Sequence, residues 1–137
     1  MPDFSRGDVV RVPFAYTDRS TRQHRPALVV SDGPLGDGGR LLWVVMITSA
    51  DNRPWVDDVS LAETYADAGL PAPSVIRAAK IATIDVAVAT PLGRVDDERL
   101  ARTMQAIRAP LTFNSASISA KRDRPSERAY ALPLGKA

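Results

Sequence analysis

The sequence contains no cysteine and only one histidine, His24. The lack of cysteine excludes disulfides, thiolate metal sites and a cysteine nucleophile, and it suits a reducing compartment. A single histidine also excludes mechanisms that need a histidine pair. No apolar run approaches the roughly 18 residues that span a bilayer, and the first residues lack the positive region and apolar stretch of a signal peptide. We therefore expect a soluble, cytoplasmic protein.

Over most of the chain, positive and negative charges nearly balance, so there is little excess charge of either sign. The formal net charge is +2, but residues 1–110 hold 13 Lys and Arg against 14 Asp and Glu, whereas residues 111–137 hold five against two. Any nucleic-acid binding by the body must therefore depend on locally placed arginines rather than on a global positive field. The basic tail, residues 111–137, is rich in Ser, Arg, Pro and Ala, so we expect it to be flexible.

Short apolar runs separated by Gly, Pro, Asp and Ser clusters dominate the first 90 residues, a pattern typical of strands joined by turns. The 137 residues suit one domain that buries roughly two-thirds of its unfolded surface, and we place it at residues 1–110. Residues 40–48 are nearly all apolar and should form the most buried strand, covered on both faces. Residues 56–61 should form an edge strand. The other predicted strands are 8–14, 25–31, 74–77 and 80–90.

A helix is predicted to begin near Asp96, because an Asp cap followed by two acidic residues complements the free N–H groups of a first turn. Apolar residues then recur at helical spacing and should pack on the sheet until Pro110 ends the helix; they are Leu100, Met104, Ile107 and Leu111. Short strands closed by one helix favour a strongly curved sheet that hides its edges. The predicted fold class is mainly β, an SH3-like barrel with a C-terminal helix.

Four ordered motifs carry a family resemblance. They are GDVVRVPF at residues 7–14, RPALVVS at 25–31, ITSADN at 47–52 and PSVIRAAKIATID at 73–85, with a weaker match, PLGRVDDE, at 91–98. In this order and spacing they resemble the MazF/PemK family of type II toxins. The resemblance spans roughly residues 6–108 and leaves only the tail outside.

The resemblance implies an SH3-like barrel that forms a homodimer, cleaves single-stranded RNA without a metal or cofactor, and is inhibited by a cognate antitoxin. Such cleavage is chemically economical, because the 2′-hydroxyl of RNA can attack the adjacent phosphate and leave a 2′,3′-cyclic phosphate. The enzyme then supplies positioning, proton transfer and charge stabilisation. The sequence shows no ligand cluster of recognisable metal-binding spacing, in keeping with that expectation.

Three residues match the catalytic positions that the resemblance implies: Arg25, Thr48 and Arg77. The planar fork of Arg25 suits phosphate oxygens and the charge that grows in the transition state. The Thr48 hydroxyl could donate to a phosphate oxygen or orient the 2′-hydroxyl. Arg77 could assist proton transfer or bind phosphate. For each residue a purely structural role at a strand end is the alternative.

Six further residues are candidate RNA contacts: Arg19, Arg22, His24, Ser49, Asn52 and Lys80. The chain departs from some family members at Ala79, where those members carry an acid that serves as base, so the general base is unassigned. His24 could act as a base near neutral pH, or it could be an exposed loop residue. Three aromatic residues could stack on bases or serve packing: Phe14, Tyr16 and Trp55.

Two other functions are compatible with the same barrel. One is a poison that binds DNA gyrase, as in the related CcdB-like toxins. Those depend on a C-terminal aromatic residue, whereas this chain ends in Leu134-Gly135-Lys136-Ala137. The other is an inactive barrel that binds RNA or a partner peptide.

Overall fold

A computed structural model describes residues 3–15 and 22–112 of the chain. These residues form six strands and one α-helix, α1 (Asp97–Arg108), with three short 3-10 turns. The strands are β1 (Asp8–Ala15), β2 (Arg22–Val29), β3 (Leu41–Ser49), β4 (Asp58–Ser60), β5 (Ser74–Asp85) and β6 (Thr90–Arg94). The prediction of a mainly β fold with a C-terminal helix is confirmed.

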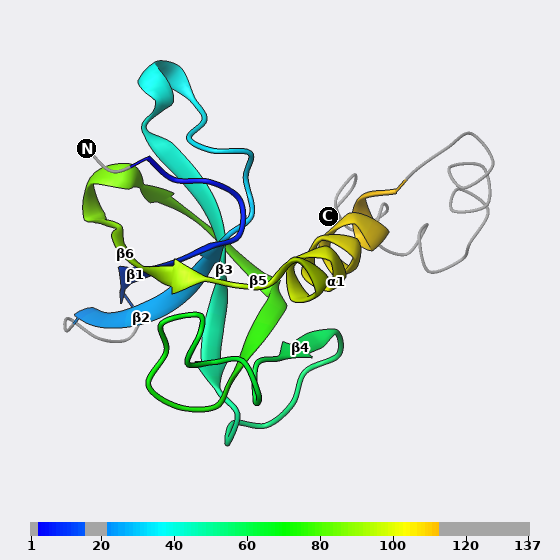
Figure 1. Cartoon of the computed structure of the whole chain (residues 1–137). Helices are drawn as coiled ribbons and strands as arrows, with labels where there is room; N and C mark the ends of the chain where they lie inside the picture. The colour runs from blue at the N-terminus through cyan, green and yellow to red at the C-terminus, as the bar shows by residue number, and fades with distance from the viewer. Residues whose placement is uncertain (1–2, 16–21, 113–137) are drawn as a thin grey trace, which may run out of the picture. The chain divides into compact units, whose positions relative to one another are not determined.

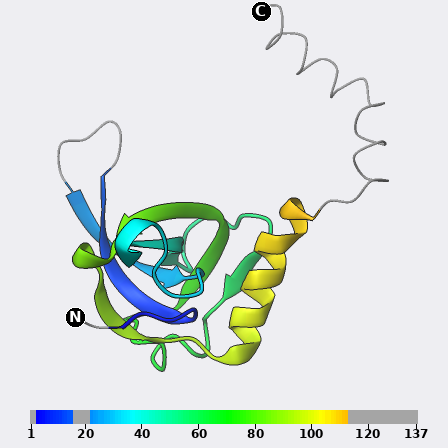
Figure 2. The same cartoon turned by 90° about the horizontal axis from the view of Figure 1, so that it is seen from above.

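All strand pairs are antiparallel, and the sheet order is β4-β5-β3-β2-β1-β6. The long strands β2, β3 and β5 bend strongly, so that the sheet curls around an interior (Figures 1 and 2). The short strand β4 lies at one edge of the sheet, as predicted for residues 56–61. The other edge is β6, which pairs with β1 across a register shift between Val9 and Val10.

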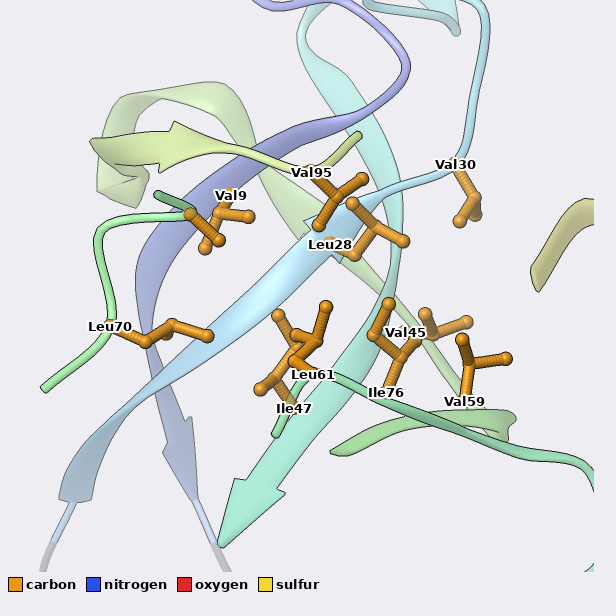
Figure 3. Packing of buried hydrophobic residues seen from close by; sticks show 11 residues of the cluster. Val9, Leu28, Val30, Val45, Ile47, Val59, Leu61, Leu70, Ile76 and Val95 are labelled. Atoms are coloured by element: carbon orange, nitrogen blue, oxygen red, sulfur yellow. The ribbon is translucent and has the colours of Figure 1, made fainter. Parts of the chain in front are cut away.

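Strands β1 to β3 bury side chains on both faces, because alternate residues enter two separate apolar clusters. On β3, Val45 and Ile47 belong to the first cluster and Val44 to the second. Figure 3 shows the first cluster, where side chains from the strands meet Leu61 and Leu70 of the β4–β5 region. The prediction that residues 40–48 form a deeply buried strand is confirmed for Val44 to Ile47, but Trp43 is 50% exposed.

Helix α1 begins where the sequence predicted. The backbone N–H of Arg99 donates to the Asp96 carboxylate at 3.1 Å, which identifies Asp96 as the cap. Leu100, Met104 and Ile107 pack against the first apolar cluster. The prediction for Leu111 was wrong, since this side chain is 73% exposed. The α-helix ends at Arg108, and Leu111 lies in the following 3-10 turn, which contains Pro110.

Two other predicted boundaries were wrong. Residues 22–24 continue β2 rather than forming a loop, because the β1–β2 ladder extends to the pair Ala15 and Arg22. The predicted strands 74–77 and 80–90 are one bulged strand, β5, that ends at Asp85. The Asp85 carboxylate accepts a 2.8 Å hydrogen bond from the N–H of Ala87, starting a 3-10 turn that separates β5 from β6.

Candidate active site

A cavity of about 180 Å³ opens where β2, β3 and β5 adjoin. Its lining comprises Arg25, Met46, Thr48, Asn52, Arg77 and Lys80. All three predicted catalytic residues and two of the predicted RNA contacts therefore meet in one place. Three of the six lining residues are cationic and none is acidic or a histidine. A cavity of this composition suits an anionic group such as a phosphate.

A bulge in β5 brings Arg77 and Lys80 to the same cavity. Residues three apart on a regular strand point to opposite faces of the sheet. Here Met46 pairs with Arg77, while the preceding Val45 pairs with Ile81, so three residues of β5 have no partner on β3. This bulge re-aims the strand and allows both side chains to line the cavity.

Thr48, near the end of β3, has its hydroxyl oriented by a local turn. Asn52 donates its side-chain N–H to the Thr48 Oγ1, and its backbone N–H donates to the Ser49 carbonyl at 3.1 Å. Since Oγ1 accepts this bond, the hydroxyl proton can be donated to another acceptor. Thr48 can thus act as a hydrogen-bond donor to a phosphate oxygen in the cavity.

Arg25 is half-buried on β2, and its Nη2 donates to the Gln23 Oε1 at 2.9 Å. Lys80 is exposed at the cavity rim. Arg77 is more deeply buried than either of them, at 8% exposed, and forms an ion pair with Asp58 at 3.1 Å. Arg25 and Lys80 are more accessible from solvent and are therefore better placed to meet a bound phosphate.

Two other predicted contacts, Ser49 and His24, do not belong to the lining of this cavity. The Ser49 Oγ accepts from the Asp51 N–H at 3.1 Å and so supports the turn after β3. His24 is exposed on β2 opposite Pro13. Arg22 lies in β2, but its side chain is outside the described part of the structure, as are Arg19 and Tyr16.

A second cavity, of about 210 Å³, shares Arg25 with the first. Its lining is mostly apolar and comprises Arg11, His24, Arg25, Pro26, Gly69, Leu70, Pro71 and Leu92. One wall depends on a close backbone contact, because a Cβ added at Gly69 would lie 2.1 Å from the Leu92 carbonyl oxygen. Arg25 thus stands between a polar cavity and an apolar one.

Sequence reasoning missed two residues of the site, Met46 and Asp58. Met46 looked like any core residue of β3, and only its position opposite Arg77 places it in the cavity lining. Asp58 is 19 positions from Arg77, but the β4–β5 register places the two directly opposite each other. The charges were visible in the sequence, whereas the register that pairs them was not.

Within residues 3–15 and 22–112, no group of three or more His, Asp or Glu side chains is arranged to hold a metal ion. None of the described helices is both long and apolar enough to cross a membrane.

The sequence and the fold are those of a known family. Residues 5–111 match the family model of the PemK-like, MazF-like toxins of type II toxin–antitoxin systems. The chain belongs to this family. No match is found among curated protein sequences.

Solved structures with the same fold include a MazE–MazF complex from Deinococcus radiodurans, with a TM-score of 0.64, 20% identity, and coverage of 83% of this chain and 100% of that one. An endoribonuclease bound to its cognate antitoxin from a mycobacterial species has a TM-score of 0.61 and 20% identity, covering 78% and 93%. The Mycobacterium tuberculosis toxin MazF-mt6 has a TM-score of 0.57 and 20% identity, covering 77% and 97%. These likenesses confirm the predicted barrel fold.

Proposed function

We propose that this toxin is a metal-independent endoribonuclease that cleaves single-stranded RNA by attack of a 2′-hydroxyl on the adjacent phosphate. The observation that carries the proposal is the meeting of Arg25 on β2 and Thr48 on β3 in one cationic cavity. The family membership supports it, and the mycobacterial relative of the same fold is itself described as an endoribonuclease.

In this mechanism Arg25 binds the scissile phosphate and stabilises the charge that grows on its oxygens. Thr48, oriented by Asn52, donates a hydrogen bond to the same phosphate. Lys80 adds a positive charge at the rim, where it contacts the RNA backbone. Arg77 also lines the cavity, but its buried ion pair with Asp58 leaves it poorly suited to bind the phosphate directly. The lining holds no carboxylate or histidine, so the general base stays unassigned; His24, in the adjoining cavity, is the described histidine near Arg25.

The test is cleavage of single-stranded RNA in excess EDTA. We expect products ending in a 2′,3′-cyclic phosphate, and no cut where the 2′-hydroxyl is replaced by hydrogen. Arg25→Ala should reduce cleavage by roughly 10²-fold or more, the scale for loss of one charge-stabilising donor. Loss of cleavage in chelator, or equal cutting at deoxy sites, would contradict the mechanism. Inhibition of gyrase supercoiling without RNA cleavage would instead favour the CcdB-like alternative.

We also propose that the toxin has a cognate antitoxin and self-associates as a homodimer. Two relatives of the same fold are solved as complexes with antitoxins. For self-association the structure offers a pair of exposed apolar side chains on β3 and β5. Trp43 pairs with Thr83, and Ile81 lies two residues along the same strand, so Trp43 and Ile81 share one face, each about half exposed.

Light scattering on the purified chain should therefore give the mass of a dimer, and Ile81→Glu should give a monomer. Val56→Glu is the matched control, because Val56 is 85% exposed but lies outside this face, in the loop before β4. A monomeric wild-type chain would contradict the dimer.

A further inference from the structure

The loop between β3 and β4 presents a tryptophan beside the polar cavity. Trp55 is 43% exposed, although a large aromatic side chain is normally mostly buried. Its ring lies over the guanidinium of Arg77, whose Cζ is 4.5 Å from the ring centroid. Arg77 also lines the cavity, so one residue contacts both the indole and the cavity.

A network centred on Asp58 fixes this tryptophan. The Asp58 carboxylate accepts hydrogen bonds from the backbone N–H of Trp55 at 2.9 Å and from Nε and Nη2 of Arg77 at 3.3 and 3.1 Å. Arg77 Nη2 also donates to the Arg53 carbonyl at 2.8 Å. The chain is therefore held on both sides of Trp55, while the ring itself is held by a cation–π contact.

The same network removes Arg77 from competition for phosphate. The Arg77 and Asp58 side chains are only 10% and 11% exposed, so each compensates the other's charge away from solvent. A buried guanidinium with both Nε and Nη2 already bonded to protein is poorly suited to clamp a second anion. The position of Arg77 suits it instead to orient the neighbouring ring of Trp55.

The backbone of the loop is also strained close to Trp55, which suits a functional role. Asp57 has φ of 70°, the left-handed region that non-glycine residues rarely adopt. The turn that contains it is closed by the 3.3 Å bond from the Asp58 N–H to the Trp55 carbonyl. Strained residues of this kind persist where surrounding contacts hold them, and they are frequent at ligand-binding sites.

We infer that Trp55 is a stacking platform for an unpaired nucleobase of the RNA whose phosphate occupies the cavity, and that Arg77 and Asp58 are positioning residues that hold the platform. This inference rests on the proposed ribonuclease function for the identity of the ligand. An exposed aromatic ring beside a cationic cavity is the arrangement by which proteins bind single-stranded nucleic acid, with bases stacking on the ring and phosphates held by the cations.

The first test measures binding without cleavage. The chain has two tryptophans, so Trp43→Phe leaves Trp55 as the only indole. A single-stranded oligonucleotide with 2′-deoxy sugars should quench its fluorescence saturably. In the Trp43→Phe background, Trp55→Leu should weaken binding by about tenfold, as measured by fluorescence anisotropy, while Trp55→Phe should restore most of the affinity.

The reference for these variants is the Trp43→Phe chain. A surface substitution at position 55 should leave its thermal midpoint unchanged. Unquenched fluorescence, or equal affinity of the Trp55→Leu variant, would overturn the inference. Absence of RNA cleavage by the wild type would remove the proposed function but not the platform, because quenching by an uncleavable strand reports binding alone.

The second test concerns the positioning residues. Asp58→Asn should weaken oligonucleotide binding, and in a double-mutant cycle its effect should largely disappear in the Trp55→Leu background, because both changes remove the same contact. Arg77→Lys keeps the positive charge but loses the paired hydrogen bonds and should behave similarly. Additive losses, or full affinity with Asp58→Asn, would show that the network does not act through Trp55. If Asp58→Asn lowers the thermal midpoint, the Trp55 variants still decide the inference.

Discussion

At the scale of single residues, the role of the Thr48 hydroxyl can be tested separately from the shape of the Thr48 side chain. Thr48→Val keeps the branched outline but loses the group that accepts from Asn52 and can donate to phosphate. We expect RNA cleavage to fall by roughly 10²-fold, with oligonucleotide affinity little changed. Thr48→Ser, which keeps the hydroxyl, is the matched control and should retain most activity. Equal activity of the Val and Ser variants would remove Thr48 from the mechanism.

Asp96 gives a residue-scale prediction for stability against pH. Partial burial alone would raise the pKa of this carboxyl, but hydrogen bonds from backbone N–H groups and the Arg99 guanidinium outweigh it, so the pKa lies below its ordinary value of 3.8. The contribution of this carboxylate to the free energy of unfolding is therefore fully present above pH 3.8, and it is lost as the pH falls through the lower pKa of the folded state.

Two substitutions test this prediction, Asp96→Ala and Asp96→Asn. The first removes the cap and should lower the free energy of unfolding by about 1 kcal/mol at neutral pH, whereas Asn is also a good cap and should cost less. Urea denaturation across pH checks both. The difference between wild type and Asp96→Asn should shrink at pH values below 3.8. A difference that grows as the pH falls would show that the carboxylate is not favoured by the fold.

At the scale of elements, two glycines allow the segment after β4 to lie against β6. Added Cβ atoms would lie 2.1 Å from Leu92 O at Gly69 and 2.4 Å from Ala68 O at Gly93. Gly69 also has φ of 83°, whereas at Gly38, with φ of 72°, an added Cβ would make only an ordinary contact, 3.7 Å from the Arg40 side chain. Gly38→Ala therefore isolates the backbone cost, about 1 kcal/mol, and Gly93→Ala isolates the clash.

We expect the order of destabilisation to be Gly69→Ala, then Gly93→Ala, then Gly38→Ala, with the Gly93 change costing about 1–3 kcal/mol or more. Thermal and urea denaturation provide the measurement. If Gly93→Ala were no worse than Gly38→Ala, the close backbone contact would not matter for the fold.

The elements that the sequence predicted well are those with a local signal. The strand at 8–14, the apolar strand at 40–48 and the helix start at Asp96 each follow from composition or capping alone. Local patterns could not show that residues 74–85 form one bulged strand, because the bulge is defined by pairing with β3. The residues of the site fall into the same two groups, those with a local sequence signal and those without one. Arg25 and Thr48 came from motifs, whereas the Asp58–Arg77 pair and the exposure of Trp55 depend on register and packing.

At the scale of the whole molecule, the apolar clusters formed by the described residues lie within residues 4–107, and we predict that the basic tail is dispensable for folding. A chain ending at residue 112 should unfold at the same temperature as the full chain. It loses five Lys and Arg against one Asp and one Glu, so its RNA affinity should depend less steeply on salt concentration. Cleavage at low salt should persist. A large loss of thermal stability would place the domain boundary further along the chain.

The contact between Gly69 and β6 joins the connection between β4 and β5 to an edge strand of the sheet without a ladder of hydrogen bonds. The amides of Ala68, Gly69 and Leu70 donate within their own turn, so van der Waals contact alone holds this seam. Closing it brings together segments more than 20 residues apart, so we expect this contact to form late in folding and to open early on heating. Because Leu92 and Gly69 also line the apolar cavity beside Arg25, loosening of this contact would open one wall of that cavity.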